Sequence, residues 1–200
     1  LPGFGRETVM LRDRIKNFVP HTPQEAADQE LVLYCLSRGD ELLTRENPVC
    51  HFTASAWVVN PGRDKVLMAY HNIYRSWAWT GGHADGEEDL CAVARREVEE
   101  ETGLQGLLLL CSEPIALDVL PVPPHQKRGK PVASHLHLNL TYLFEGDDAL
   151  PLRIKEDENS RVGWLPAGEL SRYVSEEAML SVYQKMMDRA GEYPPALSGK

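Results

Sequence analysis

Residues 80–104 read TGGHADGEEDLCAVARREVEEETGL, a glycine-bearing turn that leads into a predicted helix with three consecutive glutamates, Glu99, Glu100 and Glu101. Like charges three or four positions apart on a helix repel each other, so this crowding costs stability unless a cation or a basic partner offsets it. At about 100° per residue, Glu97, Glu100 and Glu101 fall close together, beside the apolar sector of the helix. We therefore expect these three carboxylates at the edge of the buried face and Glu99 in solvent.

Two explanations account for the acidic cluster. Arg95 and Arg96 could pair with the acids on a solvated helix face, but both arginines precede most of the acids and are outnumbered by them. Three converging carboxylates are also the ligands that a hard divalent cation such as Mg²⁺ or Mn²⁺ prefers. Gly81 and Gly82 in the preceding turn let the backbone approach a metal or phosphate closely. The pattern favours a site for Mg²⁺ or Mn²⁺.

The segments around this helix predict a sheet. Residues 51–59 and 65–70 flank the turn NPGRD, which is typical of a hairpin. In residues 134–144, leucines and aromatic residues alternate with polar residues, so His135 and His137 share a polar strand face that either lines a cavity or meets solvent. A final helix is expected after residue 175. Strands interrupted by one helix and closed by another predict an α/β or α+β sandwich.

Residues 1–46 predict a helical appendage to a main domain of residues 47–200. Thr22 and Glu25 form a capping box with a proline between them, which marks the start of a helix. The apolar positions of this helix recur at helical spacing: Ala27, Leu31, Tyr34 and Cys35. We expect this stripe to pack against the main domain or against a second subunit in a homodimer, because an isolated helix of this length is marginal in water.

The composition of the chain limits which kinds of partner and which cellular compartment we expect. The chain of 200 residues has 42% hydrophobic residues and a formal net charge of −9. This charge argues against nucleic acid or an anionic membrane surface as the main partner. No apolar run approaches the roughly 18 residues that span a bilayer, and the first ten residues lack the apolar stretch of a signal peptide. The expectation is a soluble, cytoplasmic protein.

Residues 82–104 resemble the signature of the Nudix hydrolases, G-x5-E-x7-R-E-U-x-E-E-x-G-U with U a bulky aliphatic residue. Every specified position matches: Gly82, Glu88, Arg96, Glu97, Val98, Glu100, Glu101, Gly103 and Leu104. The resemblance implies the fold of that family, a mixed sheet between helices, from residue 50 to about residue 190. Residues 1–46 lie outside it.

The resemblance also implies a reaction. Nudix enzymes hydrolyse the diphosphate linkage of a nucleoside diphosphate joined to another moiety, by attack of a metal-polarised water on phosphorus. Carried over to this chain, the metal ligands would be Glu97, Glu100 and Glu101. Gly81 would offer its carbonyl to the metal, and Arg96 would orient Glu97 through an ion pair.

Two further acids have assigned roles under the resemblance. Glu88 falls on the far side of the helical wheel, so we expect it to act from the first turn as an outer-sphere or water-ordering group. The family often supplies a fourth acid from a loop before a strand that bears a tryptophan. In KEDENSRVGW this acid would be Glu158, although the segment could equally be a plain acidic loop.

The substrate-binding candidates each have an ordinary structural alternative. Trp79 could stack on a base or pack in the core. His83 could touch phosphate or be exposed in a turn. Arg128, in the basic segment of residues 121–131, could hold a distal phosphate or belong to a solvated loop.

Two other functions occur on the same type of fold. A non-catalytic ligand sensor would be favoured by a broken signature or an attached DNA-binding domain, and an enzyme of the isopentenyl diphosphate isomerase type by an altered signature and a catalytic cysteine. The sequence shows none of these features clearly. The leading hypothesis is a metal-dependent diphosphate hydrolase whose partner is a small nucleoside diphosphate derivative.

Overall fold

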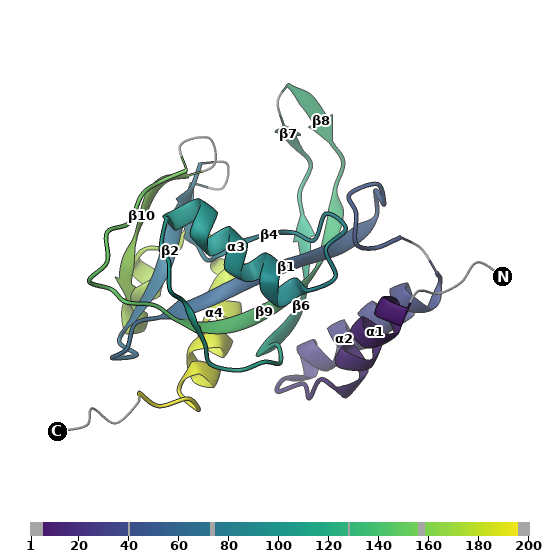
Figure 1. The fold of residues 1–200 in the computed structure, drawn as a ribbon. Coiled ribbons are helices and arrows are strands. Elements are labelled where there is room, and N and C mark those ends of the chain that lie inside the picture. Colours follow the sequence, from purple (N-terminus) through teal and green to yellow (C-terminus); the bar gives the residue numbers. More distant parts are fainter. Residues whose placement is uncertain (1–5, 40, 73–74, 128, 156–158, 196–200) are drawn as a thin grey trace.

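The computed structural model describes residues 6–39, 41–72, 75–127, 129–155 and 159–195 (Figure 1). The helices are α1 (Arg6–Asn17), α2 (Pro23–Ser37), α3 (Leu90–Thr102), the 3-10 helix η1 (Ala167–Arg172) and α4 (Glu177–Ala190). The strands are β1 (Cys50–Val59), β2 (Lys65–His71), β3 (Ser76–Ala78), β4 (Thr80–His83), β5 (Leu108–Leu109), β6 (Ala116–Val122), β7 (His125–Lys127), β8 (Lys130–Val132), β9 (His135–Glu145) and β10 (Asn159–Pro166).

Eight of the described strands form a mixed sheet built on one long parallel pair, and β7 and β8 form a second, two-stranded sheet. β1 and β9 run parallel from Cys50 opposite Leu136 to Val59 opposite Glu145. The main path is β10-β2-β1-β9-β5, with β3 on β2, β4 on β1 and β6 on β9. All pairs other than β1 with β9 are antiparallel. The predicted mixed sheet between helices is confirmed.

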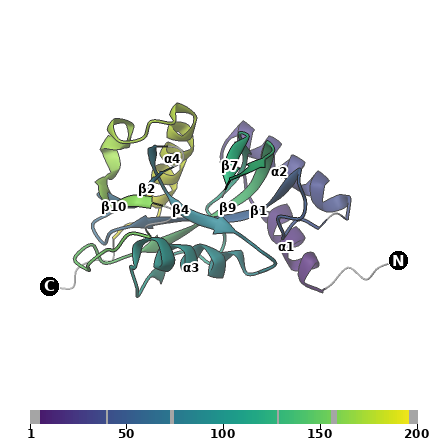
Figure 2. The ribbon, with the colours of Figure 1, turned by 90° about the horizontal axis from the view of Figure 1, so that it is seen from above.

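The two faces of the sheet carry different helices. Figure 2 shows α3 on one side and α4 on the other. Even-numbered residues of β1, such as Phe52 and Ala54, are buried in the core that contains α3. Trp57 and Val59, which point the other way, are buried with Tyr183 of α4. Because side chains alternate along a strand, the remaining odd-numbered positions of β1 open onto the α4 side.

Two segments differ from their predicted conformation. The glycine-bearing segment after Ala78 was expected to be a turn, but Thr80–His83 is a strand that pairs with β1. The basic segment of residues 121–131 was expected to be a loop, but it contains β7 and the start of β8, which pair as a hairpin that projects from the sheet (Figure 1). β4 forms backbone hydrogen bonds with the distant strand β1, and β7 forms them with its neighbour β8. The glycine and proline content of the two segments does not predict this pairing.

The predicted start of α2 is confirmed, because the Thr22 Oγ1 accepts a hydrogen bond from the Glu25 N–H at 3.1 Å. The Glu25 carboxylate reaches the His21 N–H at 2.7 Å. The expected apolar stripe, however, is wrong. Leu31 and Tyr34 are 38% and 57% exposed. The inner face of α2 consists instead of Glu25, Asp28, Val32 and Leu36.

The acidic inner face of α2 covers an edge strand. β6 pairs only with β9 among the described strands, so alternate N–H groups of β6 point away from the sheet. The Leu117 N–H donates to Glu25 at 3.2 Å, and the Val119 N–H donates to Asp28 at 3.1 Å. Carboxylates on this face therefore satisfy donors that an apolar stripe would leave unpaired.

The N-terminal helices share a core with the sheet. Leu11 and Ile15 of α1 and Val32 of α2 are buried in the same cluster as Val93 of α3. The division into an appendage of residues 1–46 and a domain of residues 47–200 stays a prediction. Among the described helices, none has both the length and the apolar character that crossing a bilayer requires.

Candidate functional site

The acidic helix α3 is fixed at both ends by its own sequence. The Asp89 carboxylate accepts hydrogen bonds from the N–H groups of Cys91 and Ala92, which caps the first turn. At the other end Gly103 takes a left-handed conformation with φ of 71°, which glycine adopts without strain. Glu88 precedes the cap and is exposed, so it lies in the turn before the helix rather than in its first turn.

The three predicted ligand carboxylates lie at the edge of the buried face, as expected. The side chain of Glu97 is 14% exposed and that of Glu100 is 47% exposed, while Glu101 is buried. The guanidinium of Arg96 lies 3.3 Å from Glu97 and 3.7 Å from Glu100. Lys155 lies 3.5 Å from Glu100. The predicted ion pair between Arg96 and Glu97 is present.

Strand β4 lies directly against these carboxylates. A Cβ atom on Gly82 would be 2.4 Å from the Cδ of Glu97, so a side chain there would collide with the carboxylate. The Gly81 N–H donates to the Glu101 Oε1 at 3.0 Å. A Cβ atom on Gly81 would be 2.6 Å from the Ser55 Oγ. Both glycines are therefore required by close approach of neighbouring groups, one on each face of the strand.

The electrostatics of this cluster suit a divalent cation. Burial raises the pKa of the Glu97 carboxyl, and the charge of Glu100 raises it further, against the opposing hydrogen bond from Arg96. The negative charge is thus incompletely offset by the protein's own cations. Carboxylate oxygens beside a strand backbone are the donor set that Mg²⁺ and Mn²⁺ prefer. The residues present fit such an ion.

A cavity of about 760 Å³ lies on the face of the sheet opposite α3. Gly81 and Gly82 belong to its wall, so β4 separates the cavity from the carboxylates of α3. The cavity volume is within the range typical of small-molecule sites. Its floor carries a polar row: Asn139 accepts hydrogen bonds from the hydroxyls of Thr53 and Ser55, each at 2.9 Å.

Trp79 lines this cavity, whereas Trp77 packs elsewhere. The Trp79 ring meets Tyr183 of α4 edge to face with centroids 5.4 Å apart. Trp77 packs against Tyr70 with centroids 5.8 Å apart. Of the two tryptophans, only Trp79 is placed to contact a molecule in the cavity.

The histidines of the cavity form a cluster that the sequence did not group. His83 was expected in a turn, but it lies half-buried on β4 beside His51 of β1 and His137 of β9. Of the two alternatives for the polar face of β9, the cavity wall is confirmed, because both His135 and His137 line it. His135 and His137 are two residues apart on one strand, so the sequence predicts that they share a face. Only the register of the sheet shows that His51 and His83 lie beside them.

Burial and crowding hold these imidazoles neutral. Desolvation and the neighbouring histidines lower the pKa of His83 and that of His137 to about 3 each. Desolvation also lowers the pKa of His51, against the hydrogen bond to Asn47. Arg45, which also lines the cavity, forms an ion pair with Asp85. At neutral pH the cluster therefore carries lone pairs rather than positive charge.

Two predicted residues lie outside the described part of the chain. They are Glu158, with its neighbours Glu156 and Asp157, and Arg128 of the basic segment.

The mixed sheet, with the acidic helix α3 beside the glycine-bearing strand β4, defines a class of protein. Comparison with known sequences identifies that class. The profile of the NUDIX domain matches residues 50–188. The chain belongs to the Nudix family, which supports a pyrophosphate-cleaving hydrolase; such hydrolases generally use divalent metal ions. No curated protein sequence matches the chain.

Solved structures share the fold at low sequence identity. An Ap4A hydrolase of C. elegans, in a binary complex, has 17% identity and a TM-score of 0.51, covering 71% of this chain and 98% of its own. The NUDIX domain of Shewanella oneidensis NrtR, complexed with ADP-ribose, has 14% identity and a TM-score of 0.50, covering 89% and 97%. The M. smegmatis Nudix hydrolase RenU has 14% identity and a TM-score of 0.50, covering 75% and 90%. These likenesses concern the fold alone.

Proposed function

We propose that this protein hydrolyses the diphosphate linkage of a nucleoside diphosphate joined to another moiety, with Mg²⁺ or Mn²⁺. The observation that carries the proposal is the position of the glycine pair. Gly82 lies against the Glu97 carboxylate, and the same pair forms part of the cavity wall. A substrate in the cavity can thus lie against β4, the strand that also contacts the acidic helix.

The carboxylates of α3 have the leading roles. Glu97, Glu100 and Glu101 hold the cation, and the Gly81 carbonyl completes the set from the strand. Arg96 holds Glu97 in place through their 3.3 Å contact. The bound cation would polarise the attacking water and neutralise charge on the diphosphate oxygens.

The remaining candidates act around this centre. Glu88, exposed before the helix, is assigned an outer-sphere or water-ordering role. Glu158 is the candidate fourth acid, and Arg128 is a candidate for binding a distal phosphate. Trp79 offers a ring to a base in the cavity. The hydroxyl and amide row around Asn139 supplies hydrogen-bonding groups for the rest of the substrate.

The test is a substrate panel with the purified protein and Mg²⁺ or Mn²⁺. The panel contains nucleotide sugars, dinucleotides and oxidised nucleotides, and it includes Ap4A and ADP-ribose because an Ap4A hydrolase and an ADP-ribose complex share the fold. Released phosphate groups are measured, and ¹⁸O-labelled water shows which phosphorus is attacked. Hydrolysis of at least one diphosphate with label in a product phosphate supports the proposal. Tight binding of a panel member with no turnover in either metal contradicts it and favours a ligand sensor.

A further inference from the structure

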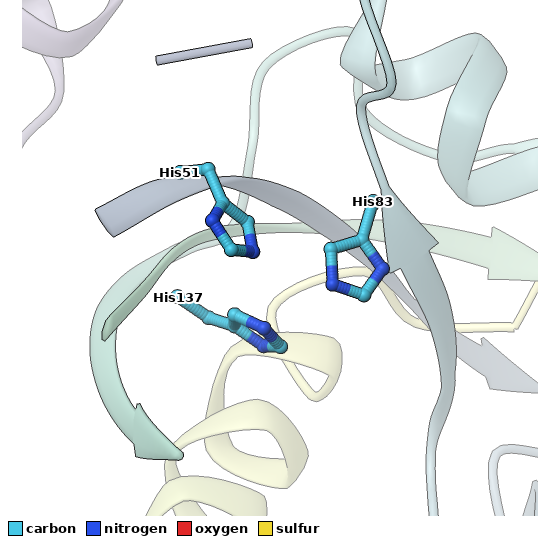
Figure 3. A group of neighbouring side chains, drawn as sticks. All are labelled: His51, His83 and His137. Carbon is cyan, nitrogen blue, oxygen red and sulfur yellow. The ribbon is translucent and has the colours of Figure 1, made fainter. Parts of the chain in front are cut away.

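Three histidines from distant parts of the sequence meet on the cavity wall. His51 comes from β1, His83 from β4 and His137 from β9, and their rings face one another (Figure 3). One ring nitrogen from each lies within 4.8 Å of the others. The pairing of strands explains the meeting, because His51 is opposite His137 in the parallel pair and Thr53 is opposite His83. Rigid strands, rather than loops, therefore hold all three rings.

We propose that His51, His83 and His137 bind one transition-metal ion of the zinc class. Imidazole nitrogen suits Zn²⁺, Co²⁺, Ni²⁺ and Cu²⁺, whereas Mg²⁺ prefers the oxygen ligands found on α3. Three protein ligands leave one position of a tetrahedral ion for water or for a group of the cavity's occupant. This site is separate from the carboxylates of α3 and does not depend on the hydrolytic reaction.

The ring of His51 has an unused nitrogen. His51 is only 5% exposed, and no hydrogen-bond partner reaches its buried Nε2 within the part of the chain that the structure describes. Its Nδ1 lies 3.3 Å from the Asn47 carbonyl, which can only accept, so Nδ1 carries the proton. Nε2 is left with a lone pair. A buried acceptor without a partner costs free energy, and a bound metal would offset that cost.

A neighbouring histidine, His135, orients the ring of His137. The His135 Nδ1 donates to the Ala133 carbonyl at 2.9 Å, because a carbonyl can only accept, and this leaves Nε2 as the acceptor of that ring. That Nε2 lies 3.2 Å from the Nε2 of His137, which therefore donates and keeps a lone pair on its other nitrogen. Hydrogen bonds of this kind fix the tautomer and orientation of metal-binding histidines.

Binding of an anion such as phosphate fits the cluster less well. An anion site needs positive charge or N–H donors, but these imidazoles are neutral and two of them already direct an N–H to other protein groups. Neutral imidazole is the form that binds a metal ion. The cluster is therefore better equipped to donate lone pairs than protons.

Cobalt binding provides a direct test. The full-length protein is stripped of metal and titrated with Co²⁺ in a large excess of Mg²⁺, which occupies oxygen-ligand sites. We expect one Co²⁺ per chain, the intense visible absorption of a tetrahedral nitrogen site, and displacement by Zn²⁺. His137→Gln should weaken Co²⁺ binding at least about 100-fold, the upper end of what loss of an outer-sphere partner costs.

Two controls separate this site from others. His125→Gln changes a histidine of the same cavity outside the cluster and should leave Co²⁺ binding unchanged, as should Glu97→Gln on α3. If His137→Gln binds Co²⁺ as the wild type does, or if Glu97→Gln abolishes the signal, the proposal is wrong.

NMR of the wild type decides the question if the His137 variant does not fold. Long-range ¹H–¹⁵N spectra report the ring nitrogens of all 7 histidines. Addition of Zn²⁺ in excess Mg²⁺ should shift the resonances of His51, His83 and His137 strongly, with a smaller change at His135. Unchanged imidazole resonances at stoichiometric Zn²⁺ would overturn the proposal.

Discussion

Gly82 of β4 lies against Glu97 of α3 so closely that a Cβ atom on the glycine would be 2.4 Å from the Glu97 Cδ. The two residues come from adjacent elements of the sequence motif, and the contact sets the distance between the strand and the acidic helix. Since Gly82 also lines the cavity, the same contact links the carboxylates to the space where a substrate can bind.

Gly82→Ala should disturb this link. The added methyl group must push the Glu97 carboxylate or the β4 backbone away, and a misplacement of about 1 Å can cost roughly 100-fold in rate. We expect kcat/KM to fall by about that factor on a confirmed substrate. Gly168→Ala is the matched control, because a Cβ atom there meets nothing within 4 Å. Equal activity of the two variants would show that the close contact is not needed.

Metal removal tests the carboxylate site. The oxygen ligands of α3 suit Mg²⁺ and Mn²⁺, so activity should vanish in excess EDTA and return when excess Mg²⁺ or Mn²⁺ is added. Steady-state rates on a diphosphate substrate measure this. Full turnover in EDTA would contradict the metal assignment. Recovery of activity with Zn²⁺ but not with Mg²⁺ would indicate that the histidines, and not the carboxylates of α3, bind the metal that the reaction needs.

A buried charge network joins the N-terminal helices to α4. The Glu25 carboxylate is fully buried and pairs with Lys185 at 3.1 Å and with Arg189. Removing one partner of a buried ion pair leaves the other charge uncompensated, which typically costs about 3–5 kcal/mol. Glu25→Gln should lower the free energy of unfolding by about that amount in chemical denaturation.

Glu30→Gln is the control for this variant, because Glu30 is exposed on the same helix. Its unfolding free energy should stay within about 0.5 kcal/mol of the wild type. If Glu25→Gln were as stable as Glu30→Gln, the network would not hold the helices to the domain.

Local patterns predicted the parts of the fold that local interactions determine. The cap at Thr22 and the position of Glu97 at the edge of the buried face follow from helical geometry over a few residues. The polar face of β9 follows from strict alternation. The spacing of the acidic helix also indicated the Nudix family, which the profile over residues 50–188 confirms.

Features that depend on distant strands were not predicted. The inner face of α2 is acidic because unpaired N–H groups of β6 face Glu25 and Asp28, and no pattern within α2 shows what it covers. The grouping of His51 with His137 depends on parallel pairing of β1 with β9, strands that are far apart in the sequence. One histidine in β1, His51, and the alternating pair in β9, His135 and His137, were the available signal, but without the register it could not be used.

Glu97→Gln should separate catalytic from structural carboxylates. A neutral amide keeps the size of the side chain but cannot replace its charge beside a cation. We expect kcat to fall by about 10³-fold, the loss typical of removing a principal electrostatic contact to the transition state. Glu99, which was expected in solvent, is half-buried in the same turn, and Glu99→Gln should alter kcat by only a few-fold. Steady-state kinetics with Mg²⁺ measure both, and near-normal kcat in Glu97→Gln would remove the chemistry from this helix face.

Glu97→Gln should lower kcat but raise thermal stability in metal-free buffer. Because burial and Glu100 raise the pKa of Glu97, the folded state favours the protonated carboxyl, and wild-type stability falls as pH rises through that raised pKa. Glu97→Gln has no such group, so its Tm in EDTA should exceed the wild-type Tm at neutral pH. The difference should disappear below about pH 4, where the wild-type carboxyl is protonated in both states. A Tm difference independent of pH would show that packing, and not the charge of Glu97, sets the cost.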